Sequence, residues 1–401
     1  MSEPLRLLYL SYDGLLDPLG RSQIAPYLTR FARQGIEVTL LSFEKREYRD
    51  HITVKRRELA RRGIRWIPLR YHKHPQGFST LWDLSVGFMT VTWHSFRRKP
   101  NIVHARGYVV ALLALWVKRL TGAKFLFDIR GFWPEERVEG GLWKSQSRWY
   151  RITKWWERRF FKAADAIVIL AERGRQLLLP RLVAWGLQMP VVVIPTCVDL
   201  ERFAPAPVGH RNGHPTRLAY VGSVGTWYQL REMATFFSVF REQCADAEWL
   251  ILTGRRDSQL AYELKPLKEE TYRVEVLPHE QVPEVLRNTQ ASLCFIKPVS
   301  SKLACCPTKV GESLACGVPV VITMGVGDCD QLIEREQVGV VVRGDSPEAY
   351  RMAAEQLRQV LKEGPTLAER CRRVAQTYFD VERGTARYVA LYRQLSQVDA
   401  R

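Results

Sequence analysis

Cysteine is missing from the first half of the sequence: none precedes Cys197, although the 401 residues contain eight. Cys305 and Cys306 are adjacent, and no two Cys-x-x-Cys sequences are spaced as zinc sites require. This pattern disfavours disulfide-stabilised secreted domains and zinc-finger proteins. We expect free, mostly buried thiols and no bound metal.

Long apolar segments are also missing. A transmembrane helix needs about 18 to 20 apolar residues, but the most apolar stretch, residues 108–117, is followed at once by Lys118 and Arg119. Residues 1–12 do not join a basic segment to an apolar one, so we expect no secretory signal. These observations predict a cytoplasmic protein.

Acidic residues are scarce relative to basic ones. The 60 Lys and Arg against 42 Asp and Glu give a formal net charge of +18. Such an excess indicates an anionic partner, which can be nucleic acid, an acidic membrane surface or a phosphorylated substrate. A hydrophobic share of 46% is typical of globular proteins, and the length is enough for two or three domains.

Short apolar runs alternate with helical patterns along the chain. We predict strands at 5–10, 38–43, 64–69, 102–104, 125–129, 166–170 and 191–194, and again at 218–221, 249–253, 274–277, 291–295, 319–323 and 339–342. This alternation predicts an α/β fold of two Rossmann-like, doubly wound domains with parallel sheets. Ligands of such sheets bind beyond the carboxyl ends of the strands, and we expect the two domains to face a cleft there.

An interruption of this alternation marks the predicted domain boundary. Residues 195–216 are rich in Pro, Gly and His, as linkers often are. We predict a first domain over residues 1–200, a linker over 201–216 and a second domain over 217–379. A last helix over 380–401 is expected to pack back on the first domain.

Four segments at predicted strand ends carry candidate functional residues. The first, residues 13–23, joins a strand to a helix that Ser22 can cap. Backbone N–H groups and the helix dipole at such a turn form an anion site, and Gly20 allows close approach of the backbone. Gly20 and Arg21 are candidate ligand contacts, although an ordinary turn capped by Ser22 explains the segment equally well.

The second segment, residues 127–136, places a carboxylate, a guanidinium and two more acids at the end of a buried strand. Loops at this edge carry function disproportionately. Asp128, Arg130 and Glu136 are therefore candidate catalytic residues. The alternative is a structural Asp–Arg pair beside Trp133.

The third segment, residues 222–228, follows the first strand of the second domain. It resembles a phosphate-binding turn but lacks the GxGxxG pattern, so it is weak evidence by itself. Gly222, Ser223 and Thr226 are its candidate ligand contacts.

The fourth segment, residues 307–321, is the most informative. Thr308 can cap a helix, and Lys309 in the first turn opposes the helix dipole, which makes sense if an anion binds there. Glu312, about one turn later, can accept hydrogen bonds from a ribose. The alternative is that Thr308 and Glu312 only start the helix, but their spacing is one residue too long for the standard capping box.

These segments resemble the retaining GT-B glycosyltransferases of family 4, which use nucleotide sugars. Residues 194–203 (IPTCVDLERF) are similar to the family's iPNGVDxxrF linker, residues 163–169 (AADAIVI) to its aDxiv strand, and residues 310–321 (VGESLACGVPVV) to its xxEaxAxGxPVV segment. The likeness covers nearly the whole chain. It implies a GT-B fold, a nucleotide-diphosphate sugar as donor and retention of anomeric configuration.

The resemblance implies roles for individual residues. It gives Glu312 the donor ribose and Gly20 a backbone contact to the diphosphate, with Lys309 and residues 222–226 near the phosphates. The chain departs from the family where the first of two glutamates is replaced by Ala304. Only Glu312 of that pair remains.

Further departures concern charge. Where the family often has Arg and Lys, this sequence has Ser223 and Thr226, so the phosphates must be neutralised by other residues, with Lys302, Lys309 and Arg130 as candidates. Arg130 aligns with the family's histidine and would not act as a general base at pH 7. A branch of the family with the same changes often builds bacterial surface polysaccharides, and this sequence looks closest to that branch.

The predicted reaction follows from the resemblance and the charges. A hexose would move from a nucleotide-diphosphate sugar to a glycan or lipid-linked glycan, while fixed donors and cations stabilise the leaving diphosphate. No DxD-type acidic pair stands in a convincing place, so we expect a metal-independent enzyme without a cofactor.

The spacing of basic and apolar residues over 142–162 predicts a basic amphipathic helix. Its basic face comprises Lys144, Arg148, Arg151, Lys154, Arg158, Arg159 and Lys162, with Trp155 among them. Trp149 and Ile152 lie on the other face and are expected in the core. The basic face predicts peripheral association with anionic lipid on the inner face of the plasma membrane, where the apolar residues 81–96 can add to the acceptor surface. The alternative is an ordinary surface helix.

Two other function classes stay open. A nucleic-acid-binding protein fits the charge, but no recognised binding module appears, so no nucleic-acid partner is expected. A sugar-nucleotide epimerase on the same architecture needs acid–base residues near the sugar and no acceptor.

Overall fold

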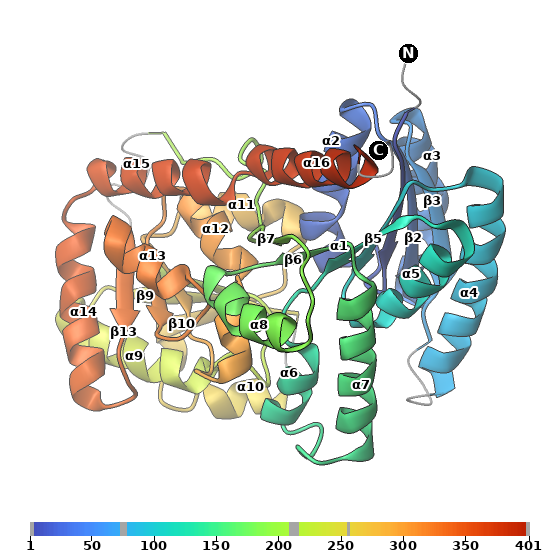
Figure 1. Cartoon of the computed structure of the whole chain (residues 1–401). Helices are drawn as coiled ribbons and strands as arrows, with labels where there is room; N and C mark the ends of the chain where they lie inside the picture. Colours follow the sequence, from blue (N-terminus) through green and yellow to red (C-terminus); the bar gives the residue numbers. More distant parts are fainter. Residues whose placement is uncertain (1–3, 73–77, 208–215, 255–256, 398–401) are drawn as a thin grey trace. The chain divides into compact units, whose positions relative to one another are not determined.

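The computed structural model describes residues 4–72, 78–207, 216–254 and 257–397. The chain forms two compact units, one of Met1–Ile194 with Val381–Arg401 and the other of Pro195–Asp380. Each unit contains one parallel sheet with helices on both faces (Figure 1). The predicted α/β, doubly wound fold class is confirmed.

The sheet of the first unit has seven strands in the order β3-β2-β1-β4-β5-β6-β7. Their bounds are β1 (Arg6–Ser11), β2 (Glu37–Glu44), β3 (Arg65–Arg70), β4 (Ile102–Arg106), β5 (Lys124–Asp128), β6 (Ala166–Ile169) and β7 (Val191–Val193). Helices cover both faces of the central strands, so nearly every residue of β4 and β5 is buried. This double burial is why the sequence shows continuous apolar runs instead of alternation.

Helices of the first unit lie on the face that the strand order dictates. The chain moves from β1 towards β3 at one edge and then from β4 towards β7 at the other, and right-handed crossovers therefore place the two sets of helices on opposite faces. One face carries α1 (Pro18–Gln23), α2 (Ala25–Arg33) and α3 (Arg49–Arg61). The other carries α4 (Phe78–Arg98), α5 (Tyr108–Thr121), α6 (Trp133–Glu139), α7 (Arg148–Ala163) and α8 (Glu172–Ala184).

The last helix, α16 (Val381–Gln397), returns to the first unit. It packs against α2, where Glu382 Oε1 lies 2.6 Å from Arg30 Nε. Its tyrosines also reach the sheet, since Tyr392 is 2.6 Å from Nδ1 of His104. The helix thus completes the core of a unit from which it is distant in sequence.

The second unit has a six-stranded sheet in the order β10-β9-β8-β11-β12-β13. The strands are β8 (Arg217–Val221), β9 (Glu248–Leu252), β10 (Tyr272–Glu275), β11 (Ala291–Cys294), β12 (Val320–Thr323) and β13 (Gly339–Val342). Its helices are α9 (Leu230–Gln243), α10 (Ser258–Glu263), α11 (Val282–Arg287), α12 (Thr308–Ala315), α13 (Cys329–Glu336), α14 (Pro347–Leu361) and α15 (Pro365–Val374). The direction of winding reverses between β8 and β11, where doubly wound sheets open a crevice for ligands.

The division of the chain differs from the predicted boundaries. Residues 195–200, assigned above to the first domain, and the described part of the predicted linker fall in the second unit. Hydrogen bonds explain this, because the Val198 N–H donates to the Phe379 carbonyl at 2.7 Å and Arg372 donates to the Phe203 carbonyl at 2.6 Å. Residues 208–215 of the predicted linker lie outside the described residues.

Two predicted helix starts are wrong. Ser22 does not cap a helix: α1 begins at Pro18, which favours a first helical position, and the Ser22 hydroxyl donates to the Pro18 carbonyl at 2.9 Å. The basic helix begins at Arg148 instead of residue 142, because Ser147 caps it by accepting the Tyr150 N–H at 3.2 Å.

All eight cysteines are free and most are buried, as expected. Within the described residues, no helix is long and apolar enough to cross a membrane.

Candidate functional site

The switch between β8 and β11 carries the third predicted segment. The turn after β8 needs two glycines, Gly222 and Gly225, whose φ angles are +150° and +134°. The Tyr220 hydroxyl donates to the Ser223 carbonyl at 2.6 Å and holds the turn against the end of the strand. Ser223 and Thr226 are exposed on this turn.

Lys309 comes from α12 and reaches the same turn. A Cβ placed on Gly222 would lie only 2.7 Å from its Nζ, so a side chain there would collide with the ammonium group. The Nζ lies 3.7 Å from the ring centre of Tyr228 and 4.1 Å from that of Tyr220. Two predicted donor segments therefore meet at one point, although Gly222 and Lys309 are 87 residues apart in the sequence.

The electrostatic state of Lys309 is unusual. Its side chain is 7% exposed, and Nζ has no hydrogen-bond partner within the described parts of the chain. Burial lowers the pKa of Lys309 from 10.5 to about 8. A buried ammonium group that lies against aromatic faces and a glycine, with no hydrogen-bond acceptor among the described residues, is costly, and an anion in the site would compensate for its lost hydration.

The amino end of α12 adds a second anion-binding feature. The predicted Thr308 cap is wrong, because the helix begins at Thr308 and its N-cap is Pro307, which makes no side-chain capping hydrogen bond. The N-cap residue therefore leaves the positive end of the helix dipole uncapped by its own side chain, and Lys309 stands in the first turn of this helix.

Glu312 is held by a chain of hydrogen bonds that the sequence did not reveal. Its Oε1 lies 2.9 Å from Nε2 of His279, whose Nδ1 lies 2.8 Å from Nη2 of Arg202. Because arginine only donates, Nδ1 must accept and Nε2 carries the proton that it donates to Glu312. Oε2 of Glu312 has no hydrogen-bond partner among the described residues, which leaves it able to accept from a ligand hydroxyl.

His279 lies in the loop after β10, on a short 3-10 helix (His279–Gln281) at the carboxyl edge of the sheet. No motif surrounds it, and its partner Glu312 is 33 residues away in the sequence. Its position just after a predicted strand was the one signal that could have found it.

Lys302 approaches the turn from a different segment. Its Nζ lies 3.8 Å from the ring centre of Trp227, and its side chain is buried. The structure therefore brings Gly222, Ser223, Thr226 and both lysines to one edge of the second unit.

In the first unit, the loop before α1 already holds an internal anion. The Glu44 carboxylate accepts the N–H of Leu15 at 2.7 Å and that of Leu16 at 3.1 Å. Those amides are not open to a ligand. Burial raises the pKa of Glu44, and the hydrogen bonds that it accepts oppose this rise.

Gly20 and Arg21 have internal contacts of their own. A Cβ on Gly20 would lie 2.0 Å from the Gly14 carbonyl oxygen, so close packing requires glycine there whether or not a ligand binds. Arg21 donates from Nε to the Leu16 carbonyl at 2.8 Å. Their predicted donor contacts stay predictions.

Asp128 is an internal anchor. It is 1% exposed and accepts from the Tyr388 hydroxyl at 3.0 Å, with His104 Nε2 at 3.3 Å and Arg130 Nη1 at 3.4 Å. Burial raises its pKa, but Arg130 and the hydrogen bond with His104 outweigh this and hold the pKa well below its usual range. The Asp–Arg pair given above as the alternative is thus present in the structure, and the catalytic role predicted for Asp128 stays a prediction.

Arg130 and Glu136 are more open than Asp128. Arg130 retains 20% of its side-chain exposure and donates from Nη2 to Gln23 at 3.1 Å. Glu136 is half-buried on α6, and its Oε1 would lie 3.1 Å from a Cβ on Gly131. Their predicted catalytic roles stay predictions.

The basic helix α7 is arranged differently from the prediction at two places. Lys154 does not belong to the free basic face: its Nζ lies 2.9 Å from Glu135 and also pairs with the buried Glu157. Trp149 and Ile152, expected in the core, are 65% and 48% exposed.

The other predicted residues of α7 do lie on the surface. Arg148, Arg151, Trp155 and Arg158 are exposed. The Arg159 guanidinium stacks 3.7 Å from the ring centre of Trp155, so this exposed aromatic side chain has a cation on its face.

Two family models match the chain. Residues 22–197 match the glycosyl transferase 4-like domain, and residues 215–360 match the glycosyl transferases group 1 model. No curated protein sequence matches.

Solved structures share the fold at low sequence identity. Sucrose-phosphate synthase from Thermosynechococcus elongatus is 14% identical with a TM-score of 0.73, covering 98% of this chain and 99% of its own. HepE from Anabaena, solved with UDP-glucose, is 12% identical with a TM-score of 0.66 and 99% coverage of each chain. WaaG, a glycosyltransferase involved in lipopolysaccharide biosynthesis, is 14% identical with a TM-score of 0.67, covering 94% of this chain and 98% of its own.

Proposed function

Because the chain belongs to the GT-B glycosyltransferases of group 1, we propose that it is a retaining enzyme of family 4. It transfers a sugar from a nucleotide-diphosphate donor to a glycan or lipid-linked glycan. The observation that carries the proposal is the buried Lys309 ammonium group. It contacts the faces of neighbouring tyrosine rings and the Gly222 turn but has no hydrogen-bond partner within the described residues. A diphosphate supplies the missing charge.

The donor would bind across the β8–β11 switch. Its diphosphate lies against the Gly222 turn, the amino end of α12 and Lys309, with Lys302 as a second cation. Its ribose hydroxyls donate to Oε2 of Glu312, whose other oxygen is fixed by His279. HepE was solved with UDP and UDP-glucose, which supports a nucleotide donor of this kind.

In the proposed reaction, the bond between the anomeric carbon and the diphosphate oxygen breaks and negative charge develops on that oxygen. Lys309, the turn amides and the α12 dipole stabilise this charge without having to reorganise. The protein's own cations do this work in our proposal, so neither a metal nor a cofactor is required. Retention follows if the acceptor attacks the face that the diphosphate leaves, with Arg130 and Glu136 as proposed contacts to sugar or acceptor.

We also propose that the enzyme is cytoplasmic and binds the inner face of the plasma membrane through its first unit. The apolar side chains of α4 that are at least 60% exposed are Phe78, Leu81, Trp82, Met89, Trp93 and Phe96. Trp149, Ile152 and Trp155 of α7 add to them. A hollow of about 470 Å³ between α5 and α7 is lined by Arg119, Trp155, Arg158, Arg159 and Lys162. Aromatic residues mixed with basic ones favour an anionic interface.

A role in cell-surface polysaccharide synthesis fits this picture. A membrane-bound, lipid-linked acceptor would explain the exposed apolar and basic surface. WaaG, which shares the fold, is involved in lipopolysaccharide biosynthesis.

The first experiment is a thermal-shift panel of UDP, GDP, dTDP, ADP, CMP and their sugars. Ligands that bind the native state raise the unfolding temperature. We expect one nucleotide to shift the wild type, Glu312→Ala to lose the shift, and Glu355→Ala, which removes an exposed acid of α14, to keep it. No shift with any nucleotide would refute the donor site, and conversion of a nucleotide sugar without an acceptor would identify an epimerase.

A further inference from the structure

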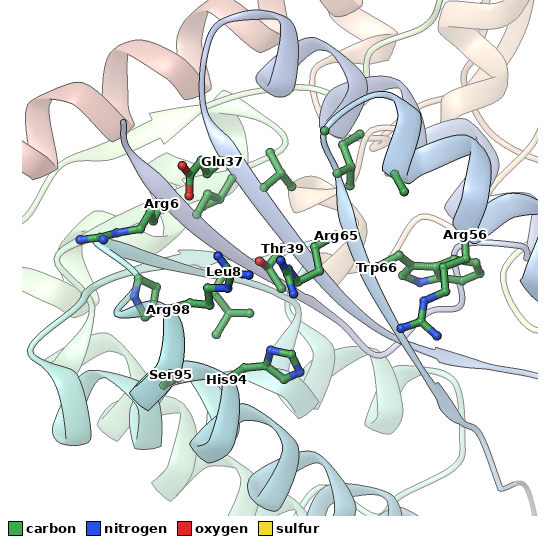
Figure 2. A pocket seen from close by; sticks show the side chains of 16 residues that line it. Arg6, Leu8, Glu37, Thr39, Arg56, Arg65, Trp66, His94, Ser95 and Arg98 are labelled. Carbon is green, nitrogen blue, oxygen red and sulfur yellow. The ribbon is translucent and has the colours of Figure 1, made fainter. Parts of the chain in front are cut away.

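A cavity of about 510 Å³ lies in the first unit at the amino ends of β1, β2 and β3 (Figure 2). Side chains of α3 and α4 complete its walls. The ligands of doubly wound sheets bind at the opposite, carboxyl edge, so this cavity is separate from the candidate sites described above. Its volume is in the range of small-molecule sites.

The cavity is strongly basic. Arg56, Arg65 and Arg98 line it, and none of the three has an acidic partner among the described residues, while Glu37 is the one acid in the lining. Figure 2 shows Arg65 from β3 and Arg98 from α4 near one another, with His94 beside them. Burial lowers the pKa of His94, and the positive charges of Arg65 and Arg98 lower it further. The lining therefore favours an anion.

Ser95 provides an independent sign of a missing ligand. It is 1% exposed, lines the cavity, and its hydroxyl has no hydrogen-bond partner in the described part of the chain. Serine and threonine within helices usually donate to a carbonyl one turn earlier. Ser85, Thr90 and Thr92 of the same helix do so, at 2.6 to 2.9 Å. Ser95 alone of these four is left without an acceptor, and a buried unpaired hydroxyl is unfavourable unless a ligand accepts its proton.

We propose that this cavity binds a phosphate ester, with Arg65 and Arg98 pairing with the phosphate oxygens and Ser95 donating a hydrogen bond to it. Guanidinium groups suit this ligand because their planar forks match phosphate oxygens. A cavity of about 510 Å³ has the size of a small-molecule site, which favours a phosphate ester over a nucleic-acid duplex.

The phosphate has two possible sources, a free phosphorylated metabolite and a phospholipid headgroup. The exposed Trp93 and Phe96 of α4 lie next in sequence to His94, Ser95 and Arg98, so acyl chains could cover them while the headgroup enters the cavity. Both sources present the same chemistry to Arg65 and Arg98.

Calorimetry with glycerol 3-phosphate and with dihexanoyl phosphatidylglycerol below its micelle concentration tests the proposal on the full chain. The variant Arg65→Gln/Arg98→Gln is compared with Arg57→Gln/Arg70→Gln, which removes the same charge from exposed positions of α3 and β3 outside the cavity. We expect roughly tenfold or greater loss of affinity in the first variant and less than about twofold in the second.

The two ligands distinguish the sources. Equal binding of glycerol 3-phosphate and the lipid identifies a free phosphate ester, and binding of the lipid alone identifies a headgroup. Absence of binding by both ligands, or an equal loss in the two double variants, would overturn the proposal.

Ser95→Ala separates ligand binding from a structural role. The variant should lower the affinity for the phosphate ester several-fold. The unfolding temperature of the free protein should stay unchanged or rise, because an unpaired buried hydroxyl is removed. A drop in unfolding temperature without a loss of affinity would show that the hydroxyl serves the fold instead.

Discussion

Replacing Lys309 with Met is expected to stabilise the free protein and to weaken nucleotide binding at the same time. Methionine has a similar length and fills the space between Tyr220 and Tyr228 without carrying a charge. Burial lowers the pKa of Lys309 from 10.5 to about 8. At about 1.4 kcal/mol per pKa unit, the charged lysine destabilises the folded state by about 3 kcal/mol.

The effect has a defined pH window. The unfolded chain keeps the Lys309 proton up to its ordinary pKa of 10.5, whereas the folded chain keeps it only up to about 8. The unfolded state therefore binds more protons between these values, and wild-type stability rises with pH there. The advantage of Lys309→Met should be complete below about pH 8 and should vanish above about pH 10.5.

Nucleotide binding should respond in the opposite direction. Loss of a charge-assisted contact to the diphosphate is worth about 1.5 to 3 kcal/mol, or roughly 10- to 150-fold in affinity. A bound diphosphate also raises the pKa of the ammonium group, so the wild type should take up protons on binding at pH 8.5. Titration calorimetry in buffers of different ionisation enthalpy measures this uptake, and Lys309→Met should lack it.

Chemical denaturation of Lys309→Met and of the control Lys268→Met, an exposed lysine of the same unit, measures the stability change. If Lys309→Met is less stable than the wild type at pH 7, the lysine serves the fold. If it binds the nucleotide normally and takes up the same number of protons, the assignment of the diphosphate to Lys309 is wrong.

Three further changes test the remaining contacts. His279→Ala should weaken nucleotide binding about 5- to 30-fold by releasing Glu312, and His279→Gln, which keeps an N–H donor, should restore part of it in the same calorimetric assay. Lys154→Met leaves the buried Glu157 without a cation, although the Tyr108 hydroxyl still donates to it, and should lower the free energy of unfolding by about 3 kcal/mol in urea titrations, whereas a surface lysine would change it little. Asp128→Asn should lower the free energy of unfolding by about 2 kcal/mol and leave nucleotide affinity unchanged. A change in affinity without a change in stability would show that Asp128 contacts the ligand.

The predicted strands match the structure because their signal is local. Continuous apolar runs in 166–169 or 320–322 arise from burial on both faces of the sheet, and no distant partner is needed to recognise them. The glycine turn at 222–228 and the α12 segment could likewise be found, since positive φ angles and helix starts depend on neighbouring residues.

Side-chain partners could not be predicted in this way. A helical wheel places Lys154 with the basic residues of α7, but Glu135 comes from another helix and turns the lysine inwards. Thr308 and Ser22 are good caps by composition, yet Pro307 and Asp17 hold those positions in the structure. His279 carries no motif, and only the fold brings it to Glu312.

Lys154 and Lys309 show how the structure separates a structural charge from a ligand-binding one. Both are lysines withdrawn from water, and burial lowers the pKa of each. For Lys154, Glu157 and Glu135 outweigh burial and raise the pKa, so the ion pairs are complete without a ligand. For Lys309 the weak attraction of Cys294 and Glu312 does not offset burial, and its nearest groups are aromatic faces and a glycine. A fold gains no stability from such an uncompensated charge, so Lys309 is better explained by a ligand that arrives with the opposite charge.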